Sequence, residues 1–405
     1  MERTILHVDM NNFFASVECM KRPILWGVPV AVCGDEELRH GIVLAKNYEA
    51  KSYGITTGEP ICRAREKCPN LVTVPAHMED YVRISCEAKK LYSTYTDRVE
   101  SYGIDECWLD VTGSGALFGD GRSIADDIRR RVKRELGLTV SVGVSYNKVF
   151  AKLGSDYKKP DAVTVIDKEN YRSIVWPLPV TDLLFVGRKT GARLKSLGIE
   201  TIGQLALANE EYLYKYLGKN GLVLHCYAMG ADSSAVMKYD EEYEEKSIGN
   251  STTAPRDIIT EDDAKVIFTV LAESVSRRLR KRGKKATVIK ISVRYNTLKS
   301  YEKQCKCEPT FVTRDLVKIA MMLFLSSRDR KIPVRSLGIQ CAGLEEADEW
   351  QITLFGKNED DARNEELEKT IDSVREKYGD NIISRGIVLS DGALSGFTPS
   401  QKRLV

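Results

Sequence analysis

The sequence has little of the residue types that most directly indicate a catalytic pair or a metal centre. Histidine occurs only four times in 405 residues, and no two histidines are spaced as a catalytic pair. His7 lies inside an apolar strand pattern and is expected to be a core residue. Ten cysteines are scattered, and the one close pair, Cys305 and Cys307, is not a CxxC motif and has no histidine beside it. Neither a zinc site nor a disulfide framework is therefore indicated.

Long apolar runs are also missing. No stretch approaches the roughly 20 apolar residues that a membrane span needs. The start of the chain, with the short apolar run Ile5–Val8, lacks the basic region and long apolar core of a secretory signal. We therefore expect a cytoplasmic protein without a membrane partner. With only 12 prolines, 42% hydrophobic and 29% charged residues, the composition excludes disordered and collagen-like classes, and the length predicts about two to four domains.

Net charge is small, but it is unevenly distributed. The 61 Lys and Arg against 58 Asp and Glu give +3, which taken alone argues against a polyanionic partner. Residues 274–335 hold 18 basic and 4 acidic residues, a local net of +14, so the rest of the chain carries −11. A basic helix end followed by a strand with Lys290 and Arg294 would put cations on the exposed face of one sheet, which suits a phosphate backbone. A solvated helix face is the alternative, although such faces usually mix signs.

Strand and helix patterns divide the chain into dissimilar parts. They alternate over residues 1–167, which predicts a sheet covered by helices on one side. Residues 168–231 have a helical pattern with short glycine-containing loops, and the acidic segment Asp240–Glu245 is typical of a solvated linker. Residues 246–344 follow the order βαββαβ, with helices near Glu261–Arg282 and Thr313–Ser327. The tail contains one more helix, Asp360–Tyr378, which could cap the preceding domain or bind a partner.

A glycine turn followed by a helix occurs twice within residues 168–231. The first lies in Phe185–Ile199 and contains Gly187, Lys189 and Gly191, and a weaker copy lies at Leu217–Gly221. Both resemble a helix-hairpin-helix element, in which backbone N–H groups at the turn and helix N-terminus bind a DNA phosphate. Either turn alone could be an ordinary helix cap, but two copies next to a basic domain favour DNA.

Three carboxylates stand at the ends of predicted strands. Asp9 ends the first apolar strand, and Asp105 and Glu106 are adjacent between two apolar strand halves. If these strands are neighbours, the three carboxylates meet at one edge of a sheet, where their repulsion calls for cations. Two Mg²⁺ ions roughly 3.5–4 Å apart would neutralise them, activate a hydroxyl and stabilise the leaving oxygen of an in-line displacement. The alternative is that the Asp-Glu pair simply fills a turn.

Several segments together resemble the Y-family translesion DNA polymerases, and the DinB group more than the UmuC group. The resemblance covers about residues 4–344 and is specific in residue type, order and spacing. It is carried by Asp9 with Phe13–Glu18, by Asn47–Lys51, by Ile104–Asp110, and by Gly143–Leu153 through Lys158–Pro160.

The resemblance implies an α+β multidomain fold, that of a right-hand polymerase. It would have a ferredoxin-like palm, small fingers, a helical helix-hairpin-helix thumb and a βαββαβ little finger. The expected boundaries are palm and fingers at 1–167 with the fingers at about 19–76, thumb at 168–231, acidic linker at 232–245, little finger at 246–344 and tail at 345–405.

The implied activity is template-directed, Mg²⁺-dependent nucleotidyl transfer from a dNTP to a primer 3′-OH. Asp9 and Asp105 would bridge two ions, Glu106 would complete the site at the primer hydroxyl, and the Met10 carbonyl would bind the nucleotide-side ion. No exonuclease domain is visible, so low fidelity without proofreading is expected. The DNA contacts expected from the glycine turn and the basic region are Gly187, Lys189, Gly191, Arg280, Arg282, Lys284, Lys285 and Arg294.

The resemblance also assigns the nucleotide site. Tyr48, Lys51 and Lys159 match positions that hold the triphosphate, where cations oppose the charge that builds on the leaving group. Phe13 and Phe14 would lie at the nucleotide, and Phe14 matches the aromatic steric gate that leaves no room for a ribose 2′-hydroxyl.

Two departures from the family pattern fall in this site. The family usually has Arg at the position of Lys51 and Ser or Thr at that of Ala45, so nucleotide binding is expected to be weaker with activity kept. Ile42 and Leu44, at positions that roof the nascent base pair, are bulkier than the residues common there, which suggests a narrower lesion range.

The tail contains a peptide that resembles the Q-x-x-L-F motif with which bacterial polymerases bind the sliding clamp. Leu354 and Phe355 would enter an apolar groove while Gln351 hydrogen-bonds at its rim. The sequence therefore predicts a monomeric bacterial enzyme whose partners are primer-template DNA, dNTP and the clamp. The alternatives are a catalytically silent DNA- and clamp-binding scaffold and a palm-fold nucleotide cyclase.

Overall fold

The computed structural model describes residues 2–36, 39, 41–241, 244–347, 359–380 and 382–397. These residues form two compact units. Unit 1 contains the described residues of 2–34 and 42–241, and unit 2 contains those of 35–41 and 244–397. Among the described residues, no helix has an apolar stretch long enough to cross a bilayer.

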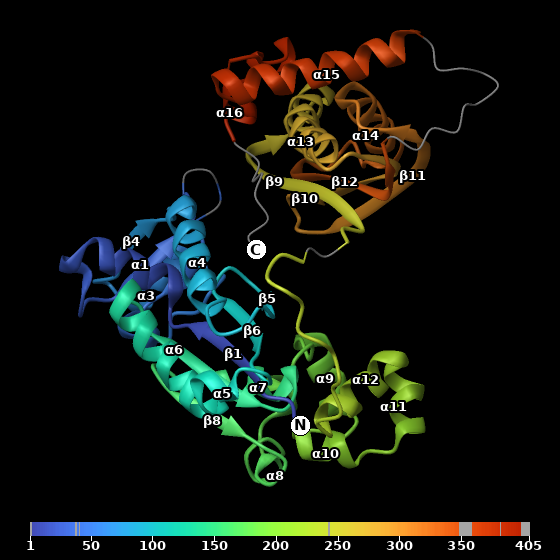
Figure 1. The fold of residues 1–405 in the computed structure, drawn as a ribbon. Coiled ribbons are helices and arrows are strands. Elements are labelled where there is room, and N and C mark those ends of the chain that lie inside the picture. Colours follow the sequence, from blue (N-terminus) through green and yellow to red (C-terminus); the bar gives the residue numbers. More distant parts are fainter. Residues whose placement is uncertain are drawn as a thin grey trace. The chain divides into compact units, whose positions relative to one another are not determined.

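Unit 1 is built around a five-stranded sheet with β1 (Ile5–Met10) at its centre (Figure 1). All six residues of β1 are buried, as expected of a strand with neighbours on both edges and layers on both faces. β1 pairs antiparallel with β6 and with β7, while β8 pairs parallel with β7. The strand order is β5 (Val99–Ser101), β6 (Glu106–Asp110), β1, β7 (Val140–Ser145) and β8 (Val163–Ile166).

Helices cover both faces of this sheet. Leu6, Val8 and Met10 belong to the core formed with α4 (Met78–Tyr92) and α6 (Gly121–Leu136). The opposite face, to which His7 and Asp9 belong by alternation, packs against α7 (Lys148–Tyr157). The expectation of a sheet covered on one side is therefore wrong.

The close packing of α7 on the sheet depends on a glycine. A Cβ at Gly143 in β7 would lie 1.9 Å from the Ala151 carbonyl oxygen and 2.5 Å from the Ser155 nitrogen. Helix and strand thus meet backbone to backbone at this point, a contact that any side chain at this position would prevent. Asn147 caps the start of α7 by accepting a hydrogen bond from the Phe150 N–H at 2.7 Å, and its amide donates to the Gly230 carbonyl at 3.0 Å.

A smaller sheet and a group of helices complete unit 1. The small sheet has the order β3 (Val43–Lys46), β2 (Val30–Cys33), β4 (Val72–Pro75). It has its own core and is accompanied by α1 (Phe13–Lys21), η1 (Pro23–Leu25), α2 (Tyr48–Ser52) and α3 (Ile61–Lys67). The remaining helices are α5 (Gly115–Phe118), α8 (Tyr171–Ile174), η2 (Val180–Asp182), α9 (Arg188–Ser196), α10 (Ile202–Leu207), α11 (Glu210–Leu217) and α12 (Lys219–Ala228).

Unit 2 follows the βαββαβ order expected from the sequence. Two helices, α13 (Glu261–Lys281) and α14 (Thr313–Ser327), pack on one face of a four-stranded antiparallel sheet. The apolar side chains of that face include Ile289, Ile291 and Leu337. The strand order is β11 (Ser300–Thr310), β10 (Lys284–Tyr295), β12 (Val334–Glu346) and β9 (Ser247–Ile258).

The C-terminal elements are part of unit 2. Figure 1 shows α15 (Glu359–Tyr378) lying across α13 and α14, followed by η3 (Gly386–Leu389) and α16 (Gly392–Ser395). Leu394 of α16 is fully buried in the apolar core of the unit. Of the two roles left open by the sequence, the described residues therefore support capping of the preceding domain.

Candidate active site and nucleic-acid interface

The carboxylates expected at one sheet edge lie side by side. Asp9 of β1 and Glu106 of β6 are directly paired across the two antiparallel strands, so their side chains share one face of the sheet. Asp105 precedes β6, and its carbonyl accepts a hydrogen bond from the Met10 N–H at 3.1 Å. The three acids and Met10 thus occupy adjacent positions at the ends of two neighbouring strands.

Two lysines bind these carboxylates. Lys152 Nζ lies 2.8 Å from Glu106 Oε2 and 3.3 Å from Asp9 Oδ2, and Lys159 Nζ lies 2.8 Å from Asp9 Oδ2. Asp156 contacts both ammonium groups, at 3.3 Å from Lys152 and 2.8 Å from Lys159. Positive and negative groups therefore alternate through the site.

Burial perturbs the acids in different directions. Burial raises the pKa of Asp9 to about 6 although Lys159 and Lys152 oppose the shift. Burial and the neighbouring Glu106 charge also raise the pKa of Asp105. Burial acts to raise the pKa of Glu106 as well, but His7 and Lys152 outweigh it and lower that pKa to about 2. His7 and Lys152 therefore compensate the burial of Glu106 fully, whereas the burial of the two aspartates is compensated only in part.

The donor set fits a hard divalent cation. All side-chain donors are carboxylate oxygens, which are the ligands that Mg²⁺ prefers. Glu106 Oε2 is buried and forms an ion pair with Lys152 at 2.8 Å, so it could serve as a cation ligand once that ammonium group moves away. As the side chains stand, no three acid, imidazole or thiol groups of the described residues are close enough to enclose an ion. A bound cation would have to draw Asp9, Asp105 and Glu106 together.

Lys159 is positioned through a buried asparagine at the end of β1. Asn11 accepts a hydrogen bond from the Asp161 N–H at 2.9 Å and donates to Ser141 Oγ at 2.9 Å. The Asp161 carboxylate is bound by Arg129 of α6 at 3.0 Å. These contacts fix the loop that carries Lys159 beside Asp9.

An aromatic stack lies at the start of α1. Phe14 is half-buried and stacks on Tyr81 of α4 with ring centroids 4.3 Å apart and planes 11° apart. The Tyr81 hydroxyl donates to Glu18 Oε1 at 2.7 Å, and His77 Nδ1 lies 2.8 Å from the same oxygen. Phe13 is buried in the core behind this stack. The expected gate ring is thus held by a side chain that is anchored to a fully buried carboxylate.

The remaining expected nucleotide residues lie in α2 and β3. Burial raises the pKa of Tyr48, and Lys159 and Asp9 are close enough to act on it electrostatically. Lys51 Nζ lies 5.7 Å from the centre of the Tyr48 ring, one turn further along α2. Ala45 is half-buried in β3. The structure therefore brings Tyr48, Lys159 and Asp9 together, with Lys51 beside them.

The two glycine turns share some features, although Gly187 has an extended backbone and Gly218 has a positive φ of 63°. Gly187 and Gly218 each stand immediately before a helix, α9 and α12, and neither helix start has a side-chain cap. A second glycine follows in each helix where a Cβ would be too close to a neighbour, 2.7 Å from Thr181 Cγ2 at Gly191 and 2.7 Å from the Leu213 carbonyl oxygen at Gly221. Lys189 is exposed in the first turn of α9.

The expected basic DNA contacts of unit 2 differ in how far their charge is compensated. Arg280 and Lys285 are buried, paired with Asp372 at 2.6 Å and with Glu365 at 3.0 Å, both from α15. Arg282 pairs with Glu245 at 2.5 Å, and Lys284 pairs with Glu346. Arg294 is exposed at the end of β10.

The acids that appeared to be missing from residues 274–335 are therefore supplied by other segments. Glu365 and Asp372 belong to α15, Glu346 ends β12, and Glu245 belongs to the acidic segment before β9. The local net of +14 is partly offset once the chain is folded. The side chains of Arg280 and Lys285 are only 6% and 7% exposed, so a DNA backbone could not reach them, whereas those of Arg282 and Lys284 are 35% and 28% exposed.

Three residues beside the candidate catalytic carboxylates were not expected from the sequence. Lys152 and Asp156 were not singled out, although their spacing of four, with Lys159 three residues further on, places such side chains on one helix face. His7 is fully buried as expected, but its Nε2 lies 3.4 Å from Glu106 Oε2, so it is also part of the wall of the site. The peptide with Gln351, Leu354 and Phe355 lies outside the described residues.

Family models match most of the chain. The model described as the impB/mucB/samB family matches residues 8–156, and its C-terminal domain matches residues 245–354. A third model, described as the IMS family HHH motif, matches residues 168–199, which include the first glycine turn.

Curated relatives and a solved structure agree with these matches. A protein named DNA polymerase IV from Acetivibrio thermocellus is 49% identical over 397 residues, which are 98% of this chain and 100% of the relative. DNA polymerase IV 1 of Bacillus subtilis is 38% identical over 392 residues, covering 96% and 93% of the two chains. A structure described as a Y-family DNA polymerase chimera aligns with a TM-score of 0.75 at 27% identity, covering 84% of this chain and 99% of that one. The right-hand fold expected from the sequence is confirmed, and the chain belongs to the impB/mucB/samB family of Y-family DNA polymerases.

Proposed function

We propose that this translesion DNA polymerase binds two Mg²⁺ ions through the carboxylates of Asp9, Asp105 and Glu106 and the Met10 carbonyl. The observation that carries the proposal is the direct cross-strand pairing of Asp9 with Glu106, with Asp105 hydrogen-bonded to Met10 beside them. A catalytically silent scaffold protein would have no evident use for three carboxylates that repel one another. Bound at these residues, the ions would activate the primer 3′-hydroxyl as nucleophile and stabilise charge on the departing pyrophosphate.

The surrounding side chains bind the incoming dNTP. Lys159, fixed beside Asp9 through Asn11 and Asp161, presents an ammonium to the triphosphate, and Tyr48 and Lys51 approach from α2. Phe14 lies under the sugar and excludes a 2′-hydroxyl by its bulk. Its stacking on Tyr81 limits the movement by which the ring could make room for a ribonucleotide.

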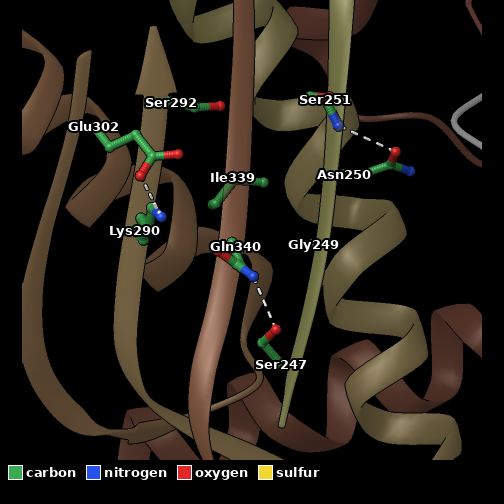
Figure 2. Close-up of a pocket in the computed structure, with 9 residues that line it drawn as sticks. All are labelled: Ser247, Gly249, Asn250, Ser251, Lys290, Ser292, Glu302, Ile339 and Gln340. Atoms are coloured by element: carbon green, nitrogen blue, oxygen red, sulfur yellow. Dashed lines mark hydrogen bonds and ion pairs between the residues drawn. The ribbon is translucent and has the colours of Figure 1, made fainter. Parts of the chain in front are cut away.

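The open face of the sheet in unit 2 is suited to a DNA backbone. Figure 2 shows a pocket on the sheet, with Lys290 at one side, where it pairs with Glu302 at 2.5 Å, and small polar side chains of β9 at the other. Side chains as small as these let a phosphate backbone approach the strands closely. Contacts of this kind position DNA without reading its sequence. The residues that line the pocket are Ser247, Gly249, Asn250, Ser251, Lys290, Ser292, Glu302, Ile339 and Gln340.

A second set of DNA contacts comes from the glycine turns. The uncapped starts of α9 and α12 present free backbone N–H groups, and Lys189 adds a cation at the first of them. Arg282, Lys284 and Arg294 are the remaining basic contacts that we propose in unit 2. We further propose that the protein works as a cytoplasmic monomer that binds the sliding clamp through Gln351, Leu354 and Phe355.

Primer extension with the full-length protein tests the catalytic assignment. Wild type is expected to extend a primer on undamaged and lesion-bearing templates, and Asp105→Ala is expected to lose at least about 10³-fold in rate. Asp97→Ala, which removes an exposed acid of the same unit, serves as the control. Extension that persists in Asp105→Ala would refute the mechanism. A wild type without extension would support the scaffold, and template-independent release of pyrophosphate from a nucleotide would support the cyclase.

A further inference from the structure

Lys152 has a position that the nucleotide-binding scheme leaves unexplained. Its ammonium contacts three carboxylates, Glu106 at 2.8 Å, Asp9 at 3.3 Å and Asp156 at 3.3 Å. The side chain is only 14% exposed. A lysine whose role was to hold the triphosphate would present its ammonium outward, as Lys159 does with 26% of its side chain exposed.

The backbone of Lys152 is fixed. α7 lies against Gly143 without room for a Cβ, and its first turn is held by the Asn147 cap. The Ser155 hydroxyl, one turn of α7 from Lys152, donates to the Lys152 carbonyl at 2.8 Å and lies 2.8 Å from His7 Nδ1. Only rotation about the side-chain bonds can therefore move the ammonium away from Asp9 and Glu106.

A divalent cation shared by Asp9 and Glu106 would need the oxygens that Lys152 now contacts. Two positive groups that share these oxygens would stand about 4 Å apart, where repulsion is strong at any effective dielectric constant found in proteins. Cation binding thus requires Lys152 either to tolerate that repulsion or to turn away.

Asp156 offers Lys152 an alternative partner. It lies one turn further along α7, its side chain is 49% exposed, and it already contacts the ammonium. Its other oxygen holds Lys159 at 2.8 Å. A triphosphate that draws Lys159 toward itself would free Asp156 to take more of the Lys152 charge.

We propose that Lys152 is a built-in counter-ion of the catalytic carboxylates and makes divalent-cation binding depend on the incoming nucleotide. Without nucleotide, Lys152 competes with the cation for Asp9 and Glu106. With nucleotide, the triphosphate supplies negative charge, engages Lys159 and lets Lys152 shift toward Asp156. This inference rests on the proposed function in one respect, the assignment of Asp9, Asp105 and Glu106 as cation ligands.

Direct titration of the full-length protein with Mn²⁺, followed by electron paramagnetic resonance, measures this dependence. The titration is done without DNA, with and without a non-hydrolysable dNTP analogue. In Lys152→Met the affinity for Mn²⁺ without nucleotide is expected to rise at least about tenfold. The factor by which the nucleotide analogue tightens Mn²⁺ binding is expected to shrink by a similar amount, because in the proposal Lys152 carries the coupling free energy between the two ligands.

Lys168→Met removes one exposed cation of the same unit and controls for the change in net charge. It is expected to leave the Mn²⁺ affinity within about twofold of wild type. Lys152→Met with unchanged or weaker Mn²⁺ affinity would overturn the proposal.

A second variant acts in the opposite direction. Asp156→Asn withdraws the alternative partner, so Mn²⁺ without nucleotide is expected to bind several-fold more weakly. If Lys152→Met does not fold, the Asp156→Asn titration still tests whether Lys152 competes with the cation. Unchanged or tighter Mn²⁺ binding in Asp156→Asn would refute the proposal. Asp105→Ala separates this inference from the proposed function, because Mn²⁺ binding that is insensitive to Asp105→Ala would remove the cation-ligand assignment itself.

Discussion

Phe14, the gate ring in the proposed function, is supported by the buried residues Tyr81 and Glu18. Tyr81 stacks on Phe14 and is anchored by its hydroxyl to Glu18, which also takes a contact from His77. These contacts tie two residues of α1, Phe14 and Glu18, to Tyr81 of α4 and to His77, the N-cap residue of that helix. If Phe14 is the sugar gate, as proposed, we expect sugar selection to depend on how firmly Glu18 holds Tyr81.

Two substitutions of Tyr81 separate anchoring from stacking. Tyr81→Phe keeps the ring but removes one donor from a buried carboxylate, which is expected to cost about 1–3 kcal/mol in the free energy of unfolding with little change in sugar selection. Tyr81→Ala also removes the ring, so the preference for dNTP over the ribonucleotide is expected to fall several-fold. The measurement is the ratio of kcat/KM for the two nucleotides. Equal ratios in Tyr81→Ala and wild type would mean that Phe14 needs no support from Tyr81.

Lys51 stands at a position where the family resemblance leads us to expect an arginine. An ammonium beside Tyr48 carries the charge of an arginine but not its two-pronged hydrogen-bonding geometry. Lys51→Arg is therefore expected to lower the KM for dNTP by about 3- to 10-fold with kcat little changed. Steady-state primer extension measures this, and a KM that stays the same or rises would contradict the explanation.

At the scale of elements, the start of α13 is held by an ionised carboxylate. Asp263 accepts hydrogen bonds from the N–H groups of Thr260 and Ile259 and from Arg256 at 2.8 Å. Burial would raise the pKa of Asp263, but Arg256 and these N–H groups outweigh burial and hold the pKa well below its usual value. The Thr260 hydroxyl completes the capping box by accepting from the Asp263 N–H.

A lowered pKa in the folded state fixes the sign of the pH dependence. The stabilisation by Asp263 is complete above about pH 4, the ordinary carboxyl pKa, and is lost as the pH falls toward the pKa of the folded state. Asp263→Asn is therefore expected to be less stable than wild type at pH 7, with the difference shrinking as the pH drops below about 4. Chemical unfolding followed by circular dichroism at several pH values measures this difference. A difference that grows on acidification would contradict the assignment.

The packing of α15 on unit 2 is largely electrostatic. Glu368 and Arg280, each with 6% of the side chain exposed, lie 3.3 Å apart. Glu368 also accepts from the Thr313 N–H at 3.1 Å and from Arg385 at 2.6 Å. Removing one partner from such a buried network leaves the others uncompensated.

Glu368→Gln is accordingly expected to destabilise unit 2 by about 3–5 kcal/mol. Glu376→Gln, at an exposed position of the same helix, is the matched control and should change stability by less than about 0.5 kcal/mol. Hydrogen exchange of the α13 and α15 amides reports the effect within unit 2. Similar exchange rates in the two variants would show that α15 contributes little to the stability of the unit.

At the scale of the whole molecule, folding pairs several cations of the basic segment 274–335 with acids from other parts of the chain. The exposed Arg294 and the buried Lys285 both lie in β10, and we expect only Arg294 to release a counter-ion when DNA binds. Arg294→Ala is expected to reduce the slope of log affinity against log salt by about 0.9 for primer-template DNA, whereas Lys285→Met should leave it unchanged. Fluorescence anisotropy over a range of salt concentrations measures both slopes. Equal slopes for the two variants would exclude this division of the basic residues.

Much of the fold and the acid cluster could be predicted from the sequence because their signals are local. The alternation around Asp9, the adjacent Asp105 and Glu106, and the βαββαβ order each occupy a short stretch of chain. The partners of Arg280 and Lys285 could not be predicted, because they lie more than 75 residues away in α15. The contacts of Lys152 with Asp9 and Glu106 could not be predicted for a similar reason, since they depend on how α7 packs across β1 and β6.

The alternation in β1 has a genetic consequence. Within Ile5–Met10, Leu6, Val8 and Met10 belong to one apolar core. Ile5, His7 and Asp9 alternate onto the opposite face, where Ile5 packs in a small apolar cluster and Asp9 pairs with Glu106. A single-codon deletion here would shift the register and send each downstream side chain to the wrong face. The gene should therefore tolerate no single-codon deletion in these six codons, and protein abundance and polymerase activity would be lost in the same step.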